Sequence, residues 1–218
     1  MMDTKLITQK VSEAKKSSKK RNFKQTVDLI ITLKELNLKN SEEQVDMFVQ
    51  LHYPLGKKVK VCALVGPELR PKAEKVFDTV ISEGNFEKLS KDKKQLKKLV
   101  REHKYFVAQA NLMPRIASLF GKVLGPKGKM PNPKAGCVVD LRTDLKALYD
   151  KLQKLVRVTA KTQPQVQVAV GSEEMEDSQI ADNIHTVYDH LVHTLPKGEA
   201  NISKVFVKLT MGKPVEVK

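Results

Sequence analysis

The sequence predicts an α/β protein in which a domain built from both chain ends encloses a second domain. Strand-like runs rich in β-branched residues dominate the two ends of the 218-residue chain. Strands and amphipathic helices alternate in the middle, which indicates a largely parallel sheet covered by helices. We therefore expect a discontinuous α+β domain from residues 1–66 and 157–218, and an inserted α/β domain at residues 67–156. A single continuous α/β domain is the alternative.

Two helices and five strands are expected in the terminal segments. Asp3 is a candidate N-cap for a basic helix over residues 3–20, whose apolar side chains fall on one side. A helix over 178–195 carries apolar residues at 3.6-residue spacing and stops at Pro196. Alternation and β-branched residues predict strands at 26–33, 44–52, 58–66, 165–170 and 203–209.

The middle of the chain follows a different pattern. Apolar spacing predicts helices at 71–83, 91–102 and 111–120. A longer amphipathic helix is expected to start at Asp144 and to run through Val156. The short apolar run YFVAQ at 105–109 is typical of a buried strand.

The net positive charge of the chain indicates an anionic binding partner. The chain has 40 Lys and Arg against 25 Asp and Glu, which gives a net charge of +15. Nucleic acid is the commonest partner of so basic a protein, and an anionic membrane surface comes second. Basic residues concentrate at 5–24 and 87–104, whereas 173–199 is acidic. We therefore expect a basic side for a polyanion and a separate acidic patch.

The membrane partner is disfavoured by the sequence. No apolar run approaches the ~18 residues of a spanning helix, and the first residues lack the apolar core of a signal peptide. Cys62 and Cys137 lie far apart, which fits reduced thiols in the cytoplasm better than a disulfide framework. We expect a cytoplasmic protein with no membrane partner.

The most conspicuous motif is GKVLGPKGKMPNPKAG at residues 121–136. Its spacing fits neither a Walker A loop nor a dinucleotide-binding fingerprint. It is a rigid basic loop, because its prolines restrict the backbone while four lysines offer point charges for phosphates. These lysines are Lys122, Lys127, Lys129 and Lys134. A structural loop with solvated lysines is the alternative.

The run KKSSKKRNFKQT at residues 15–26 combines basic residues, hydroxyls and Phe23 just before a strand. Lysines hold phosphates, hydroxyls and amides can contact riboses, and an aromatic ring can stack on a base. This composition indicates an RNA-binding surface. The alternative is a flexible basic tail with Phe23 in the core.

No pattern in the chain indicates catalysis. The motifs GxSxG, HExxH and CxxC are absent, and the three histidines of the 178–195 helix do not converge as zinc ligands would. We expect no catalytic residue, no metal and no cofactor. Two rivals remain: a phosphoryl-transfer enzyme that uses the 121–136 loop, and a generic binder of polyanions or membrane surfaces.

Four motifs, in order along the chain, resemble those of the L-one family of large-subunit ribosomal proteins. Their sequences resemble the archaeal members of that family. They are NFKQTVDLIITL (22–33), LHYPLGKKVKV (51–61), LGPKGKMPNPKAG (124–136) and KLTMGKPVEV (208–217). The resemblance implies the nested fold, with a three-layer, Rossmann-like inserted domain. It also implies a non-enzymatic protein that is monomeric when free and ribosome-associated when bound. Its implied partners are large-subunit rRNA at the mobile stalk beside the tRNA exit site, its own mRNA, whose translation it would repress, and exit-site tRNA, whose release it would assist.

The resemblance places the rRNA-binding surface on the discontinuous domain. Carried over by motif, the candidate residues are Glu13, Phe23, Lys24, Thr26, Lys161, Thr162, Gln167, Lys204, Lys208, Thr210, Met211 and Gly212. A hydroxyl, a polarizable apolar side chain and a glycine in sequence suit contact with riboses and RNA shape. The lysines of the 121–136 loop would be secondary phosphate or tRNA contacts. Gly66 and Pro67 are the expected hinge, because glycine absorbs dihedral change.

Overall fold

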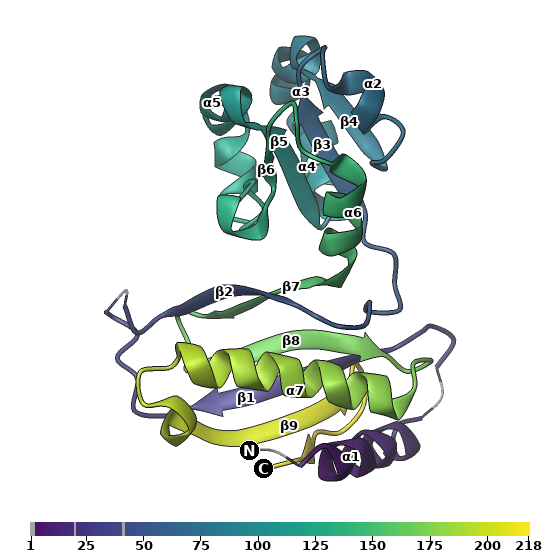
Figure 1. Cartoon of the computed structure of the whole chain (residues 1–218), viewed down its shortest axis with the longest axis vertical. Helices are drawn as coiled ribbons and strands as arrows, with labels where there is room; N and C mark the ends of the chain where they lie inside the picture. Colours follow the sequence, from purple (N-terminus) through teal and green to yellow (C-terminus); the bar gives the residue numbers. More distant parts are fainter. Residues whose placement is uncertain (1–2, 20, 41) are drawn as a thin grey trace. The chain divides into compact units, whose positions relative to one another are not determined.

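The computed structural model describes residues 3–19, 21–40 and 42–218, and the chain divides into two compact units of mixed α/β structure (Figure 1). The terminal unit comprises Met1–Lys57 and Lys154–Lys218, and the inserted unit comprises Lys58–Gln153. Each unit has its own β-sheet structure and its own helices.

The terminal unit is organised around one strand from the N-terminal segment. Strand β1 (Thr26–Leu33) pairs antiparallel with β8 (Gln165–Ser172) on one side and with β9 (Ile202–Leu209) on the other. The short strand β10 (Val215–Glu216) extends the sheet beyond β9. This pairing is what makes a single unit from segments at opposite ends of the chain.

Two helices cover one face of this sheet (Figure 1). They are α1 (Thr4–Ser17), which Asp3 caps by accepting a hydrogen bond from the Lys5 N–H, and α7 (Asp177–Thr194). Alternate residues of β1 point into the apolar core beneath the helices, while those between them are only half-buried. The opposite face of the sheet therefore carries Thr26, Asp28, Ile30 and Thr32.

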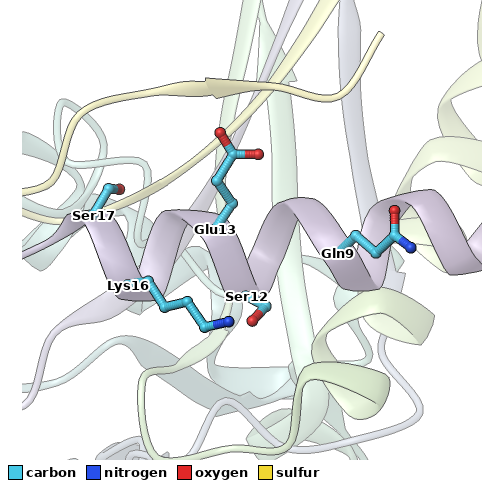
Figure 2. A pocket seen from close by; sticks show the side chains of 5 residues that line it. All are labelled: Gln9, Ser12, Glu13, Lys16 and Ser17. Carbon is cyan, nitrogen blue, oxygen red and sulfur yellow. The ribbon is translucent and has the colours of Figure 1, made fainter.

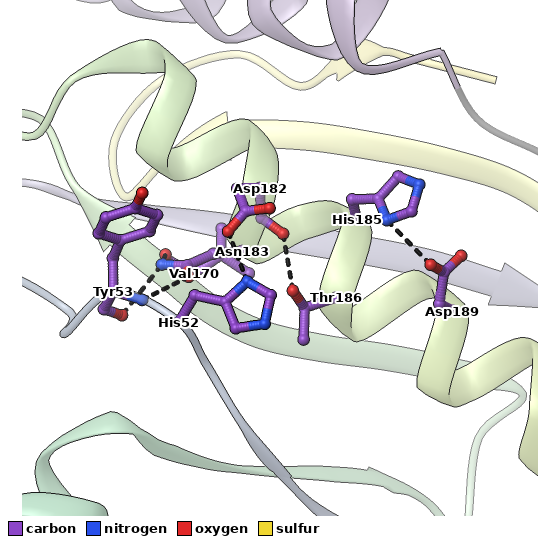
Figure 3. A network of polar contacts seen from close by, with 8 residues as sticks. All are labelled: His52, Tyr53, Val170, Asp182, Asn183, His185, Thr186 and Asp189. Carbon is purple, nitrogen blue, oxygen red and sulfur yellow. Dashed lines mark hydrogen bonds and ion pairs between the residues drawn. The ribbon is translucent and has the colours of Figure 1, made fainter.

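A second sheet in the terminal unit consists of β2 (Val45–Gln50) and β7 (Leu155–Ala160), paired antiparallel. The segment that follows β2 is held against α7 by Asn183, which is fully buried. Its carboxamide accepts a hydrogen bond from the Tyr53 N–H at 3.1 Å and donates to Tyr53 O at 3.2 Å and to Val170 O at 2.9 Å. Figure 3 shows these hydrogen bonds beside the contact of His52 Nδ1 with an Asp182 carboxylate oxygen, which are 2.6 Å apart.

The inserted unit contains a parallel sheet with the strand order β4-β3-β5-β6. Its strands are β3 (Val61–Val65), β4 (Thr79–Ser82), β5 (Tyr105–Gln109) and β6 (Val138–Val139). Its helices are α2 (Arg70–Ala73), α3 (Phe86–Lys91), α4 (Lys93–Glu102), α5 (Met113–Leu124) and α6 (Leu145–Lys154). Every residue of β3 and β5 is buried, so both faces of the sheet are covered.

Single helical turns complete the elements of both units. They are η1 (Glu83–Asn85), η2 (Ala110–Leu112) and η3 (Pro133–Ala135) in the inserted unit, and η4 (Gly198–Asn201) in the terminal unit.

The predicted bounds of two helices are wrong in part. The helix predicted at 71–83 ends after one turn, and Thr79–Ser82 forms β4 because its β-branched residues pair with β3. The helix expected to run through Val156 ends at Lys154, and the chain continues as β7. In both cases a strand partner distant in sequence prevails over local helical spacing.

The boundaries between the two units differ from the expected ones at residues 66–67 and 156–157. The sequence pattern assigns β3 to the domain of the chain ends, but its parallel pairing with β4 and β5 places it in the inserted unit. The passages lie at Lys57–Lys58 and at Gln153–Lys154. Just inside the inserted unit, Gln153 holds Val59 by accepting from its N–H at 2.8 Å and donating to its carbonyl at 2.9 Å.

An acidic residue of the β2–β7 sheet makes the stability of the fold depend on pH. Asp46 on β2 receives hydrogen bonds from Arg157 at 2.8 and 2.9 Å and an ion pair from Lys161 at 2.6 Å. The Arg157 contact, helped by Lys161 and opposed by burial, lowers the pKa of Asp46 to about 2. A depressed pKa stabilises the fold above the ordinary value of 3.8, and this contribution is lost as the pH falls towards 2.

We expect Asp46→Asn to lower the free energy of unfolding at pH 7 by about 1 kcal/mol, after allowance for solvent screening. Urea denaturation at pH 7 and at pH 2.5 measures the change. The deficit should shrink at the lower pH, whereas the exposed Glu42→Gln variant should match the parent. A deficit of equal size at both values would contradict the assigned role of the carboxylate.

Candidate nucleic-acid interface

The start of β1 and the end of β9 meet at one corner of the terminal sheet. Val27 lies opposite Leu209, so the residues just outside this pair are neighbours. The Thr210 N–H donates to Thr26 O at 3.0 Å, and the Thr26 N–H donates to the Thr210 hydroxyl at 3.1 Å. The two hydroxyl oxygens are 2.7 Å apart. We call the surface formed by Phe23, Thr26, Thr210, Met211 and Gly212 the RNA corner, after the role that we propose for it.

The turn after β9 has little space for a larger residue at its last position. The Gly212 N–H donates to Leu209 O at 2.9 Å, which closes the turn. A Cβ atom at Gly212 would come within 3.2 Å of the Leu209 Cβ. Glycine therefore keeps the turn tight and leaves its backbone accessible to a ligand.

Two apolar side chains of the RNA corner are unusually exposed. Met211 is 60% exposed and Phe23 is 51% exposed, the highest values among the large apolar side chains in the described ranges. The alternative that places Phe23 in the core is therefore wrong. An exposed ring and an exposed thioether beside two hydroxyls suit contact with bases and riboses, since each can pack on a flat apolar surface.

Gln25 holds the RNA corner together, and it was missed by sequence reasoning. It is only 1% exposed. Its carboxamide accepts from the Met211 N–H at 3.2 Å and donates to the Ser18 hydroxyl at 3.3 Å and to Glu173 at 3.4 Å. Gln25 thus joins the end of α1 to the turn after β9. A signal was present: Gln25 continues the alternation of core positions in β1, and a polar group at such a position needs partners.

The open face of the sheet extends away from the RNA corner. In register, Lys208 lies opposite Asp28, Gln167 opposite Ile30, and Lys204 opposite Thr32. All three predicted residues are half-buried or exposed on the face that α1 and α7 leave uncovered. Phe206, half-buried between the two lysines, is a further candidate that the K-x-F-x-K alternation could have indicated.

Asp28 is the acidic residue of this open face. Its partial burial raises the pKa of its carboxyl group, and the charges of Lys208 and Lys57 oppose the rise.

Several predicted cations are already paired within the protein. Lys24 forms an ion pair of 2.8 Å with Glu174, and Lys204 forms one of 3.1 Å with Glu216. Lys161 contacts Asp46 at 2.6 Å. The pairs of Lys24 and Lys204 are exposed on both sides and therefore weak, so a phosphate could compete for these two lysines.

The acidic segment after β8 does not form a separate patch. Antiparallel pairing places Thr26 opposite Ser172, so residues 173–177 lie beside the basic segment before β1. Lys15 contacts Asp177 at 2.6 Å, in addition to the pairing of Lys24. Strand pairing therefore brings part of the acidic block of residues 173–199 next to the basic block of residues 5–24.

Glu13 lies on the exposed side of α1. It forms an ion pair of 3.0 Å with Lys10. With Gln9, Ser12, Lys16 and Ser17 it lines a shallow depression along the helix, where Glu13 and Lys16 point to opposite sides (Figure 2). Gln25 donates a hydrogen bond to Ser18 at the end of α1, so this helix, which carries Glu13, is attached to the RNA corner.

Lys161 and Thr162 lie at the opposite end of the sheet from the RNA corner. They belong to the turn between β7 and β8, and β8 begins at Gln165, which is opposite Thr32. Thr26 and Thr32 are about 20 Å apart along an extended strand. The structure therefore separates these two residues from the Thr210 group.

The conspicuous 121–136 stretch is only partly a loop. Residues 121–124 form the last turn of α5, which places Lys122 on a helix. Lys129 donates from its ammonium group to Val100 O and to His103 O, each at 2.6 Å. Burial, followed by the charge of Lys127, lowers the pKa of Lys129. Lys134 is exposed in η3, so the four lysines do not act alike.

Gly66 and Pro67 are not at a passage between the units. They follow β3 inside the inserted unit, where the Gly66 N–H donates to Gln109 Oε1 at 2.8 Å. The passage lies nearer Gly56, which has φ +72° and whose Cβ would approach the Ser172 Cβ to 2.8 Å. The hinge prediction for Gly66 and Pro67 rests on the assignment of β3 to the domain of the chain ends, and it stays a prediction.

The described residues offer little for other chemistry. Among them, no three His, Cys, Asp or Glu side chains gather as metal ligands would. Burial raises the pKa of the Cys62 thiol to about 12 and that of Cys137 to about 11, so neither forms a nucleophilic thiolate readily. No helix in the described part of the chain is long and apolar enough to cross a membrane.

Comparison with known proteins identifies the class. A family model described as the ribosomal protein L1p/L10e family matches residues 14–213, and the chain belongs to this family. It is therefore a ribosomal protein with a structural role and not an enzyme.

Similar archaeal proteins match almost the whole chain. It is 39% identical over 217 residues to the large ribosomal subunit protein uL1 of Methanocaldococcus jannaschii, with 100% of this chain and 97% of that protein covered. It is 42% identical over 213 residues to the protein of the same name from Nanoarchaeum equitans, with 95% and 98% covered.

The role of Gln25 can be tested by an apolar replacement of similar size. Gln25→Met should lower the free energy of unfolding by about 1–3 kcal/mol, because the Met211 N–H and Glu173 lose a buried partner. Urea denaturation measures this, with the exposed Gln163→Met as the matched control. Equal stability of the two variants would show that Gln25 does not organise the RNA corner.

Proposed function

We propose that the chain is a component of the large ribosomal subunit that binds large-subunit rRNA through the RNA corner, at the mobile stalk beside the tRNA exit site. The observation that carries this proposal is the pairing of Thr26 with Thr210 next to the exposed side chains of Phe23 and Met211. Membership of a ribosomal protein family and the names of the archaeal relatives support it.

The chemistry of the RNA corner suits RNA shape. The two hydroxyls can exchange hydrogen bonds with ribose 2′-hydroxyls, and the tight turn at Gly212 presents backbone to the ligand. Met211 and Phe23 would pack on a base or sugar. Such contacts read the form of an RNA fold, because they do not depend on the donor and acceptor pattern of a groove.

Positive charge would supply the part of the affinity that does not depend on sequence. The net charge of +15 attracts any polyanion. Its contribution falls as the salt concentration rises, because the counterions that binding releases from the RNA then gain less entropy. On the open face, Lys208 would hold a phosphate near the RNA corner and Lys204 one towards the other end of the strand, with Gln167 between them in register. Specificity would reside at the corner and general affinity along the face.

The same surface would bind the chain's own mRNA where that mRNA carries a similar fold, and so repress its translation. Exit-site tRNA is the third proposed partner, with Lys122, Lys127 and Lys134 as phosphate contacts that would assist its release. The family resemblance of the four sequence motifs supports these two roles. The free protein would be a monomer in the cytoplasm.

Removal of one hydroxyl tests the RNA corner. Thr210→Val keeps the shape of the side chain and should cost about 1–3 kcal/mol of rRNA affinity, or roughly 5- to 150-fold. Met211→Ala should weaken binding too, and at 60% exposure it should leave the stability of the fold nearly unchanged. Filter binding to a fragment of the rRNA stalk measures both variants.

Thr194→Val is the matched control, because it removes an exposed hydroxyl at the end of α7, where no RNA contact is proposed. It should bind as tightly as the parent. If both corner variants also bind as tightly as the parent, the surface is wrongly assigned. If the parent binds random RNA and acidic vesicles as tightly at the same salt concentration, the protein is a generic polyanion binder.

A further inference from the structure

A second basic site lies in the inserted unit, between α4, α5 and the loop after α5. It is a cavity of ≈ 530 Å³. Its walls are Lys97, Val100 and Arg101 from α4, Lys122 and Val123 from α5, and Pro126, Lys127 and Lys129 from the loop. We call it the α4–α5 pocket.

Four of the five cations in the α4–α5 pocket have no acidic partner. Among the residues that the structure describes, no carboxylate makes an ion pair with Lys97, Arg101, Lys122 or Lys127, although ion pairs engage lysines elsewhere in the chain. All four side chains are exposed. Like charges gathered around one concavity repel one another, so a bound polyanion would relieve the repulsion.

Lys129 has a different part in the same pocket. Its ammonium group donates to Val100 O and His103 O at the carboxyl end of α4, where the helix dipole is negative. The loop is also held by the Lys129 N–H, which donates to Leu124 O at 3.0 Å. Lys129 therefore offsets the negative end of α4 beside the pocket, and it ties the loop that carries Lys127 to α4 and α5.

The remaining wall is apolar. Val100 is 1% exposed, and Val123 is half-buried next to the exposed ring of Pro126. No carboxylate from the described ranges lines the cavity, so a magnesium-bound nucleotide would find no ligand for its metal among these side chains. Cations around an apolar wall suit a strand that carries several phosphates and presents riboses or bases between them.

We propose that the α4–α5 pocket binds neighbouring phosphates of an RNA strand, with Lys97, Arg101, Lys122 and Lys127 as the phosphate contacts. The guanidinium of Arg101 can bind one phosphate with two parallel hydrogen bonds, and the lysines act as point charges around it. The site adds two residues of α4 to the proposed loop contacts, and it does not depend on rRNA binding at the RNA corner.

The test uses the full chain and two RNAs: a fragment of the rRNA stalk and an unstructured 12-nucleotide RNA. We expect Arg101→Ala with Lys127→Ala to weaken binding of the short RNA about tenfold or more. The salt slope of this binding should fall by about 1.4, or about 0.7 for each phosphate that the variant no longer neutralises. Fluorescence anisotropy over a series of salt concentrations gives both quantities.

A charge-matched control separates the pocket from net charge. Lys72→Ala with Lys146→Ala removes two exposed lysines of the same unit that do not line the pocket. This control should bind the short RNA within about twofold of the parent. The proposal is overturned if the two double variants lose the same affinity, because net charge alone would then explain the binding.

The source of the phosphates is decided by competition. Unlabelled short RNA, tripolyphosphate and ATP are compared as competitors at equal total phosphate concentration. Tripolyphosphate and ATP should displace the labelled RNA only at much higher phosphate concentrations than the unlabelled RNA does. Displacement at lower concentrations would overturn RNA as the ligand and favour a free phosphate compound. The loss of short-RNA affinity in the Arg101→Ala, Lys127→Ala variant does not depend on whether the stalk fragment binds at the RNA corner, so the two proposals can fail independently.

Discussion

The pairing of β1 with both β8 and β9 is the constraint on which the terminal unit depends. It brings residues 26–33 next to 165–172 and 202–209, so segments from opposite ends of the chain form one sheet. The same register places Thr26 beside Thr210 and sets Gln25 under Met211. The RNA corner is therefore a consequence of strand pairing, because no single segment contains its parts.

Strand pairing also determines which basic side chains are available to bind phosphates. The acidic residues after β8 meet the basic segment before β1, and they reduce its net charge at the edge of the RNA corner. The lysines of the open face are spread along a whole strand length, whereas those of the α4–α5 pocket converge on one cavity. The terminal unit thus offers shape and hydroxyls, and the inserted unit offers concentrated charge.

Sequence reasoning succeeded where a local pattern was sufficient. The predicted bounds of β1 are those observed, since its alternation matches a sheet with one buried face, and the predicted bounds of α7 agree within a residue at each end. It failed where a distant partner decides: β4 and β7 are strands only because β3 and β2 pair with them. For the same reason Gln25 was missed, and the two carbonyl contacts of Lys129 could not be foreseen.

The central claim is that the RNA corner meets the rRNA. Photo-crosslinking of the full chain to a fragment of the large-subunit rRNA stalk, with the attached peptides mapped, tests it most directly. Crosslinks should concentrate on the peptides that contain Phe23 and Met211, the two exposed apolar side chains of the corner. Crosslinks confined to the inserted unit, with none on those two peptides, would contradict the account.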